Sequence, residues 1–257
     1  MPPRGLPLQR RAGQVAGSFT NPPLFPLAAG AASHYADSVN SLNPRSYIQR
    51  SRRNLPHWRQ EGVTYFITGR TADALPAEKL HWLRDELRIW LRVHGLPVNT
   101  RPADLPPALL PEYYRRFRMT LEKWLDQGFG ECRLKEPRAA KIVGDAFQHF
   151  IDERYQLGPW VVMPNHYHVL VTPLPGFTLG AILNSWMSFT AKQINKLHGR
   201  SGQFWQHEPY DHIVRNGERL RKLEQYIAEN PVKAKLREGE YLLGGLPLQR
   251  RAGKAGE

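Results

Sequence analysis

The sequence contains very little cysteine and no long apolar run. Cys132 is the single cysteine among 257 residues, so one chain cannot form a disulfide framework or a zinc site built from cysteines. Such usage suits a reducing compartment, and we expect a cytoplasmic, nucleoid-associated protein. The first residues carry charge but lack the apolar core of a signal peptide. No stretch reaches the roughly 18 apolar residues of a membrane helix, so no spanning segment is expected.

Acidic residues are also scarce. The chain has 23 Asp and Glu against 36 Lys and Arg, a formal net charge of +13 and a pI of about 10.1. This excess predicts a polyanionic partner, either nucleic acid or an anionic membrane, although a merely basic soluble surface has the same composition. Without a membrane segment, nucleic acid is the favoured partner, because phosphate contact is the common use of such an excess.

The two ends of the chain differ in composition from its middle. Residues 1–47 are rich in Pro, Gly, Ala and Ser without a sustained period, which is typical of a flexible arm. The nonapeptide Gly-Leu-Pro-Leu-Gln-Arg-Arg-Ala-Gly stands at 5–13 and again at 245–253. Two copies are too few for a solenoid. We expect a folded domain over 48–237 and a flexible tail over 238–257.

Periodicity predicts an α+β domain between the two ends. The residue types and their spacing predict two single strands, a hairpin of two strands and five helices. Without the helices at 76–127, the order is strand, helix, strand, strand, helix, strand, helix. This is the order of the split βαβ, ferredoxin-like fold, with an antiparallel sheet and helices on one face. A helical insertion at about 76–128 then follows the first strand. The expected strands are 63–70, 159–163, 166–172 and 210–214, and the expected helices are 76–93, 109–127, 137–155, 179–198 and 218–230.

Two histidines on one expected strand are candidate metal ligands. His166 and His168 are two residues apart, so their side chains point to the same face. Neighbouring imidazoles can hold one divalent ion, but they can equally be ordinary core or surface residues. A zinc hydrolase of the His-x-His-x-Asp kind needs an aspartate where Leu170 stands. The pair therefore needs a further ligand from elsewhere in the chain.

The last expected helix offers two polar candidates on one face. Tyr226 and Asn230 are four residues apart. A tyrosine can act as a nucleophile on an activated phosphodiester, and an asparagine carbonyl suits Mg or Mn. The alternatives are a core aromatic at Tyr226 and, at Asn230, a helix end before Pro231.

Taken together, these motifs resemble the REP-associated tyrosine transposases. These enzymes are HUH single-strand DNA transposases with one catalytic tyrosine. The resemblance rests on Val-Val-Met-Pro-Asn-His-Tyr-His-Val-Leu at 161–170 and Tyr-Ile-Ala-Glu-Asn-Pro-Val-Lys-Ala at 226–234, and it covers about 50–237. Asn-Leu-Pro-His-Trp at 54–58 supports it. Lys235 stands where the family pattern has glycine.

The resemblance implies a reaction and a site. Tyr226 would attack single-stranded DNA at hairpins of repetitive palindromic elements, keep the 5′-phosphate and release a 3′-OH. His166, His168 and Asn230 would bind the divalent ion, Mg or Mn. The family pattern further implies a monomer that uses no small-molecule cofactor and no membrane. Tyr210 is the reserve nucleophile.

Several other residues are candidate DNA contacts. Clustered arginines can bind phosphates, and a tryptophan can stack on unpaired bases. A solvated basic face and core packing are the alternatives. The candidates are Arg52, Arg53, Arg115, Arg116, Arg118, Arg215 and Trp205. Two other functions stay open: a hairpin-binding regulator of the same fold that does not cut DNA, and a small-molecule metal hydrolase that uses the histidine pair.

Overall fold

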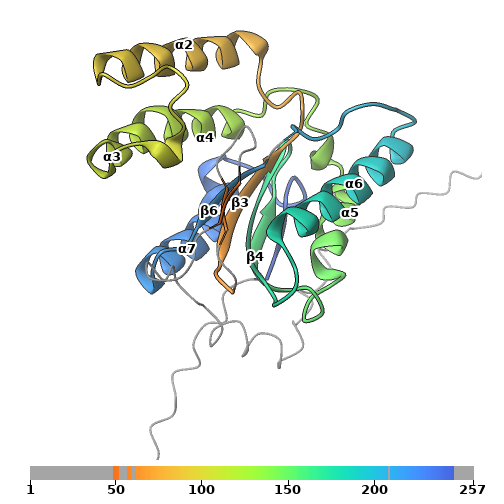
Figure 1. Cartoon of the computed structure of the whole chain (residues 1–257). Helices are drawn as coiled ribbons and strands as arrows, with labels where there is room; N and C mark the ends of the chain where they lie inside the picture. Colours follow the sequence, from red (N-terminus) through yellow and green to blue (C-terminus); the bar gives the residue numbers. More distant parts are fainter. Residues whose placement is uncertain (1–48, 52–56, 60–61, 208, 246–257) are drawn as a thin grey trace, which may run out of the picture.

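The computed structural model describes residues 49–51, 57–59, 62–207 and 209–245, and its centre is a mixed α/β arrangement around one antiparallel sheet (Figure 1). The five strands lie in the order β6-β3-β5-β4-β7. They are β3 (Tyr65–Arg70), β4 (Tyr155–Val162), β5 (His166–Pro173), β6 (Tyr210–Ile213) and β7 (Leu242–Gly244). A separate two-stranded sheet pairs β1 (Gln49–Ser51) with β2 (His57–Arg59). The arm at 1–47 lies outside the described residues.

Helices cover both faces of the five-stranded sheet. α5 (Pro137–Gln148) and α6 (Leu179–Leu197) pack on one face. α7 (Gly217–Lys233) packs on the other face, where Leu220, Leu223 and Ile227 meet apolar residues of β3, β4 and β5. The expectation of helices on one face was therefore wrong. The reason is the pattern of β5, which is buried along its whole length and needs cover on both sides.

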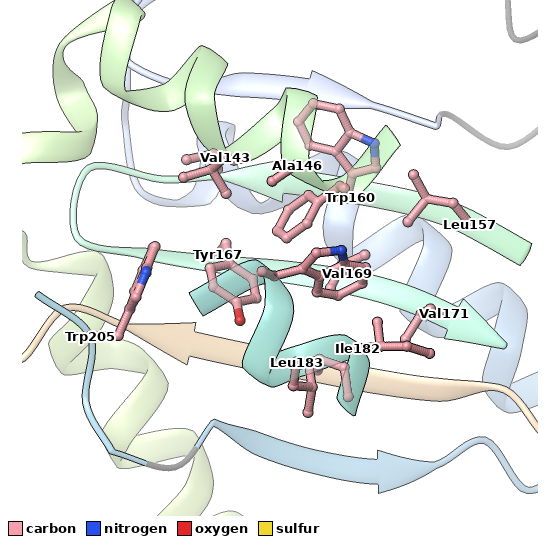
Figure 2. Packing of buried hydrophobic residues seen from close by; sticks show 14 of the residues in the cluster. Val143, Ala146, Leu157, Trp160, Tyr167, Val169, Val171, Ile182, Leu183 and Trp205 are labelled. Carbon is pink, nitrogen blue, oxygen red and sulfur yellow. The ribbon is translucent and has the colours of Figure 1, made fainter. Parts of the chain in front are cut away.

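The face that packs against α5 and α6 holds the larger apolar core. Tyr167, Val169 and Val171 alternate along β5 and point into it (Figure 2). Tyr167 lies across β3 at Gly69, where a β-carbon would overlap the tyrosine ring. The intervening residues of β5 point to the opposite face, toward α7. The core thus fixes which side chains β5 presents to α7.

The helices between β3 and α5 form a subdomain with a core of its own. Its first helix is α2 (Ala77–Val93), and its second runs without a break through α3 (Leu110–Tyr113), a π-helical segment η3 (Tyr114–Arg118) and α4 (Met119–Asp126). Trp90, Tyr113 and Phe117 are buried between these helices. Short 3₁₀ segments connect the elements: η1 (Pro102–Asp104), η2 (Pro107–Leu109) and η4 (Arg133–Lys135). Figure 1 shows α2–α4 projecting beyond one end of the sheet.

Two expected helix ends were wrong. The helix expected over 137–155 ends at Gln148, because the chain turns at Asp152 with φ 64° and enters β4. The last helix does not stop before Pro231, which is buried inside α7, and Ala234 N donates to Asn230 O beyond it.

The tail expected to begin at 238 contains β7, which pairs with β4. Gly244 lies against the ring of Trp160, where a β-carbon would not fit, so the absence of a side chain permits this contact. Residues 246–257 lie outside the described part. Within the described residues, no helix is long and apolar enough to cross a membrane.

Candidate functional site

The two histidines lie side by side on the sheet face that α7 covers. His168 is directly opposite Thr68 on β3, and His166 is opposite Arg70. The two imidazole centroids are 5.0 Å apart. Residues opposite each other on antiparallel strands share a face, so the end of β3 supplies the immediate neighbours of both rings.

Hydrogen bonds orient both imidazoles through Nδ1. Nδ1 of His166 is 2.8 Å from Oδ1 of Asn165, whose Nδ2 donates to Phe129 O. Because Oδ1 can only accept, Nδ1 of His166 carries the proton and Nε2 presents a lone pair. Nδ1 of His168 is 2.9 Å from Thr68 Oγ1. Nε2 of His166 is buried and has no hydrogen-bond partner in the described part of the chain.

Burial keeps both rings neutral. It lowers the pKa of His166 to about 3. Burial also lowers the pKa of His168, and the charges of His166 and Arg118 add to that shift. Neutral imidazoles are the form that binds metal ions. The pair therefore offers lone pairs across the whole neutral pH range.

α7 places Tyr226 and Asn230 over the histidines. The hydroxyl of Tyr226 lies 3.5 Å from Nε2 of His168, with ring centroids 5.2 Å apart. Asn230 is buried one helical turn beyond Tyr226. Burial, followed by the charges of Glu122 and Asp126, raises the pKa of Tyr226. The phenol is therefore protonated at neutral pH and needs a proton acceptor before it can attack.

Two carboxylates of α4 complete the site, and the sequence reasoning missed both. Oε2 of Glu122 accepts a hydrogen bond of 3.3 Å from the hydroxyl of Tyr226. Oδ1 of Asp126 lies 3.9 Å from Nε2 of His166 and accepts no hydrogen bond from any described residue. Burial raises the pKa of both carboxyl groups, that of Asp126 to about 6. The available signal was the spacing of Arg118, Glu122 and Asp126, which places them on one helix face.

The candidate DNA contacts separate into exposed and buried residues. Arg115, Arg116 and Arg215 are exposed, and Arg116 is paired with Glu86 at 2.8 Å. Arg118 is largely buried. Arg52 and Arg53 lie outside the described residues.

Trp205 does not lie on the surface, so the expected base-stacking role was wrong. Its side chain is 5% exposed and belongs to the core in Figure 2. Its Nε1 donates to Thr190 Oγ1 at 2.8 Å, and its ring packs against Tyr167. A satisfied indole nitrogen and a tight ring contact explain why the tryptophan is buried.

Tyr210 is turned toward the helical subdomain. Its hydroxyl lies 3.4 Å from that of Tyr114, and its ring lies under the guanidinium of Arg118. The hydroxyl at the histidine pair therefore belongs to Tyr226 and not to the reserve nucleophile.

Metal binding has to be judged from the donor atoms. In the described part of the chain, no three His, Cys, Asp or Glu side chains are grouped so that they could hold a metal ion. The expected set is different, because it combines two histidines with the amide of Asn230. This set stays a prediction.

Comparison with known proteins gives weak structural likeness. No family model matches the chain, and no curated protein matches it. A solved structure of a REP-associated tyrosine transposase bound to a REP hairpin aligns with 17% identity and a TM-score of 0.35, covering 75% of this chain and 73% of that chain. A likeness at this level carries no argument about function.

Proposed function

We propose that the chain is a metal-dependent single-stranded DNA endonuclease and strand transferase that forms a 5′-phosphotyrosine intermediate at DNA hairpins. The observation that carries the proposal is the position of the Tyr226 hydroxyl beside the His168 imidazole. Tyr226 and the histidines come from the two motifs that resemble the REP-associated tyrosine transposases. The net charge of +13 suits a polyanionic substrate.

The strand order supports the finer fold assignment. Without β7, the order β6-β3-β5-β4 is that of the split βαβ fold, in which the first strand lies between the third and the fourth. In this interpretation α7 is the additional helix that carries the nucleophile of the HUH fold. The helical subdomain is an insertion after the first strand.

The buried polar atoms fit a divalent cation. Among the described residues, Nε2 of His166 and Oδ1 of Asp126 are buried without hydrogen-bond partners. Orphaned buried polar atoms are costly unless a ligand satisfies them. His166, His168 and Asn230 would hold Mg²⁺ or Mn²⁺, with Asn230 binding through its carbonyl oxygen. The ion would polarise a phosphodiester.

The side chains of the site account for the nucleophile and its proton. In the proposed reaction the Tyr226 oxygen attacks phosphorus, and the bond from phosphorus to the 3′ oxygen breaks. The tyrosine proton passes to Glu122, which accepts its hydrogen bond. The departing 3′ oxygen takes up a proton from water and leaves as a hydroxyl. The phosphotyrosine conserves the bond energy, so religation needs no ATP.

The test is to trap the covalent intermediate. A labelled single-stranded hairpin from the DNA that flanks the gene is incubated with Mn²⁺ and the wild-type chain, Tyr226→Phe or Tyr210→Phe. We expect an adduct that survives denaturation for wild type and Tyr210→Phe but not for Tyr226→Phe. Intact hairpin binding without any adduct would favour the alternative, a hairpin-binding regulator that does not cut DNA.

A further inference from the structure

Two guanidinium groups near the histidine pair have buried, unpaired nitrogens. Nη1 of Arg70 and Nη2 of Arg118 are shielded from solvent and have no hydrogen-bond partner among the residues that the structure describes. A buried cationic donor without a partner is costly to the fold. Side chains that the fold retains at such a cost are candidates for binding an anion.

Arg70 belongs to the same sheet face as the histidines. It is the last residue of β3 and lies directly opposite His166 on β5. Paired residues of antiparallel strands project to the same side. The arginine side chain therefore leaves the sheet beside the histidine pair and on the side of Tyr226.

Arg118 reaches the site from the helical subdomain. It is the last residue of the π-helical segment, and its guanidinium carbon lies 3.3 Å from the ring centroid of Tyr210 on β6. Nη2 lies 3.9 Å from Oε1 of Glu122, which is too long for a hydrogen bond. Stacking on the tyrosine fixes the guanidinium plane and leaves this nitrogen free.

Among the described residues, no carboxylate accepts a hydrogen bond from either of these two guanidinium nitrogens. Burial lowers the pKa of Arg70, and the charge of Arg118 lowers it further, so the two cations repel each other. The carboxylate of Glu122 accepts a hydrogen bond from Tyr226, and that of Asp126 faces His166. An additional anion would satisfy both arginines at once.

We propose that Arg70 and Arg118 bind the phosphodiester that Tyr226 attacks. This assignment rests on the function proposed above. A guanidinium donates paired hydrogen bonds to the non-bridging oxygens of a phosphate. Both nitrogens are closed to solvent, so in this proposal DNA reaches them when the helical subdomain moves away from the sheet. The hydrogen bonds that the arginines then make to the phosphate favour this movement. Inorganic phosphate has the same chemistry, and the experiment has to separate the two.

The experiment removes charge from the protein and from the DNA in turn. Binding is measured in the Tyr226→Phe background, so that cleavage is not required. The probe is the hairpin with single-stranded flanks, in which a neutral methylphosphonate replaces each flank phosphodiester one at a time. Arg70→Met and Arg118→Met are compared with Lys123→Met, which removes an exposed cation from the same helix as Glu122.

At one flank position, we expect the methylphosphonate to weaken binding by about tenfold or more. Each arginine variant weakens binding of unmodified DNA by about tenfold to hundredfold, but changes binding of that methylphosphonate DNA by less than about threefold. Lys123→Met affects both DNAs alike. Arg118→Lys, which keeps the charge, restores part of the affinity for unmodified DNA.

Two results would overturn the assignment. One is an equal loss of affinity for both DNAs in the arginine variants, which indicates a structural role. The other is Arg118-dependent thermal stabilisation by inorganic phosphate without position-specific coupling, which assigns the pocket to free phosphate. A missing tyrosine–DNA adduct in the wild type would contradict the proposed function only, since this coupling is measured without cleavage.

Discussion

The hydroxyl oxygen of Tyr226 lies 3.5 Å from Nε2 of His168, although 58 residues separate the two in the sequence. The contact exists because α7 packs on the sheet face opposite α5 and α6. The helical subdomain then closes over this contact and brings Glu122 to the tyrosine hydroxyl.

His166→Ala is expected to abolish cleavage of hairpin DNA while hairpin binding survives. In the proposal, the neutral imidazole of His166 binds the ion through Nε2. It does not contact DNA directly, so binding of the hairpin does not require it. Excess chelator should stop cleavage by the wild type in the same way. His149→Ala, an exposed histidine on the far face, serves as the control. Loss of binding in a folded His166→Ala protein, or full activity in chelator, contradicts the proposed role.

Glu122→Gln is expected to slow single-turnover cleavage by about 10²- to 10⁴-fold without weakening binding of the hairpin. The amide keeps the shape of the side chain but cannot take the proton of Tyr226. Glu78→Gln, an exposed residue of α2, should cleave at the wild-type rate. Faster cleavage by Glu122→Gln would show that the carboxylate restrains the tyrosine instead of activating it.

His212 should make the fold sensitive to acid. Burial, with smaller contributions from Arg219, Arg118 and Arg215, lowers its pKa to about 3. The unfolded chain takes up the proton near pH 6.5 and the folded chain does not, so stability is present above pH 6.5 and is lost as pH falls toward 3. His212→Phe should reduce this loss by about 1.4 kcal/mol per pH unit, measured by urea unfolding at pH 7, 6 and 5. Parallel curves for both proteins would refute the prediction.

Gly69→Ala should destabilise the fold by about 1 to 3 kcal/mol, because the new methyl overlaps the ring of Tyr167. Gly217→Ala is the matched control, since its β-carbon meets only Arg221 Nη1 at 3.7 Å. Thermal or urea unfolding of the two variants measures the difference. Equal stability of both would mean that Tyr167 moves away at little cost.

Lys235→Gly should stabilise the fold by about 1 kcal/mol. Lys235 follows α7 with φ 56°, and Leu236 N closes the helix end on Pro231 O. This left-handed conformation is the one that glycine adopts without steric cost. Lys233→Gly, inside the last turn of α7, should instead cost about 1 kcal/mol. Chemical unfolding checks both signs, and a destabilised Lys235→Gly would contradict the account of the helix end.

Local periodicity predicted most elements and failed where neighbours decided the outcome. The helix expected over 137–155 is shorter because β4 needs the residues from Tyr155 for pairing with β5. The polar neighbours of Trp205 in the sequence favour a residue that stacks on unpaired bases. Its core contacts and its hydrogen bond to Thr190 bury it instead. Local sequence carries no signal for either contact, since both depend on residues distant along the chain.

The sequence by itself determined which polar residues share a face. Two residues along a strand and four along a helix return to the same side by backbone geometry alone, which places His166 with His168 and Tyr226 with Asn230. Only the tertiary structure decided that these two pairs meet. It also decided that Arg118, Glu122 and Asp126 face them, because a charged helix face normally turns to solvent and only the packing of the helical subdomain turns this one inward.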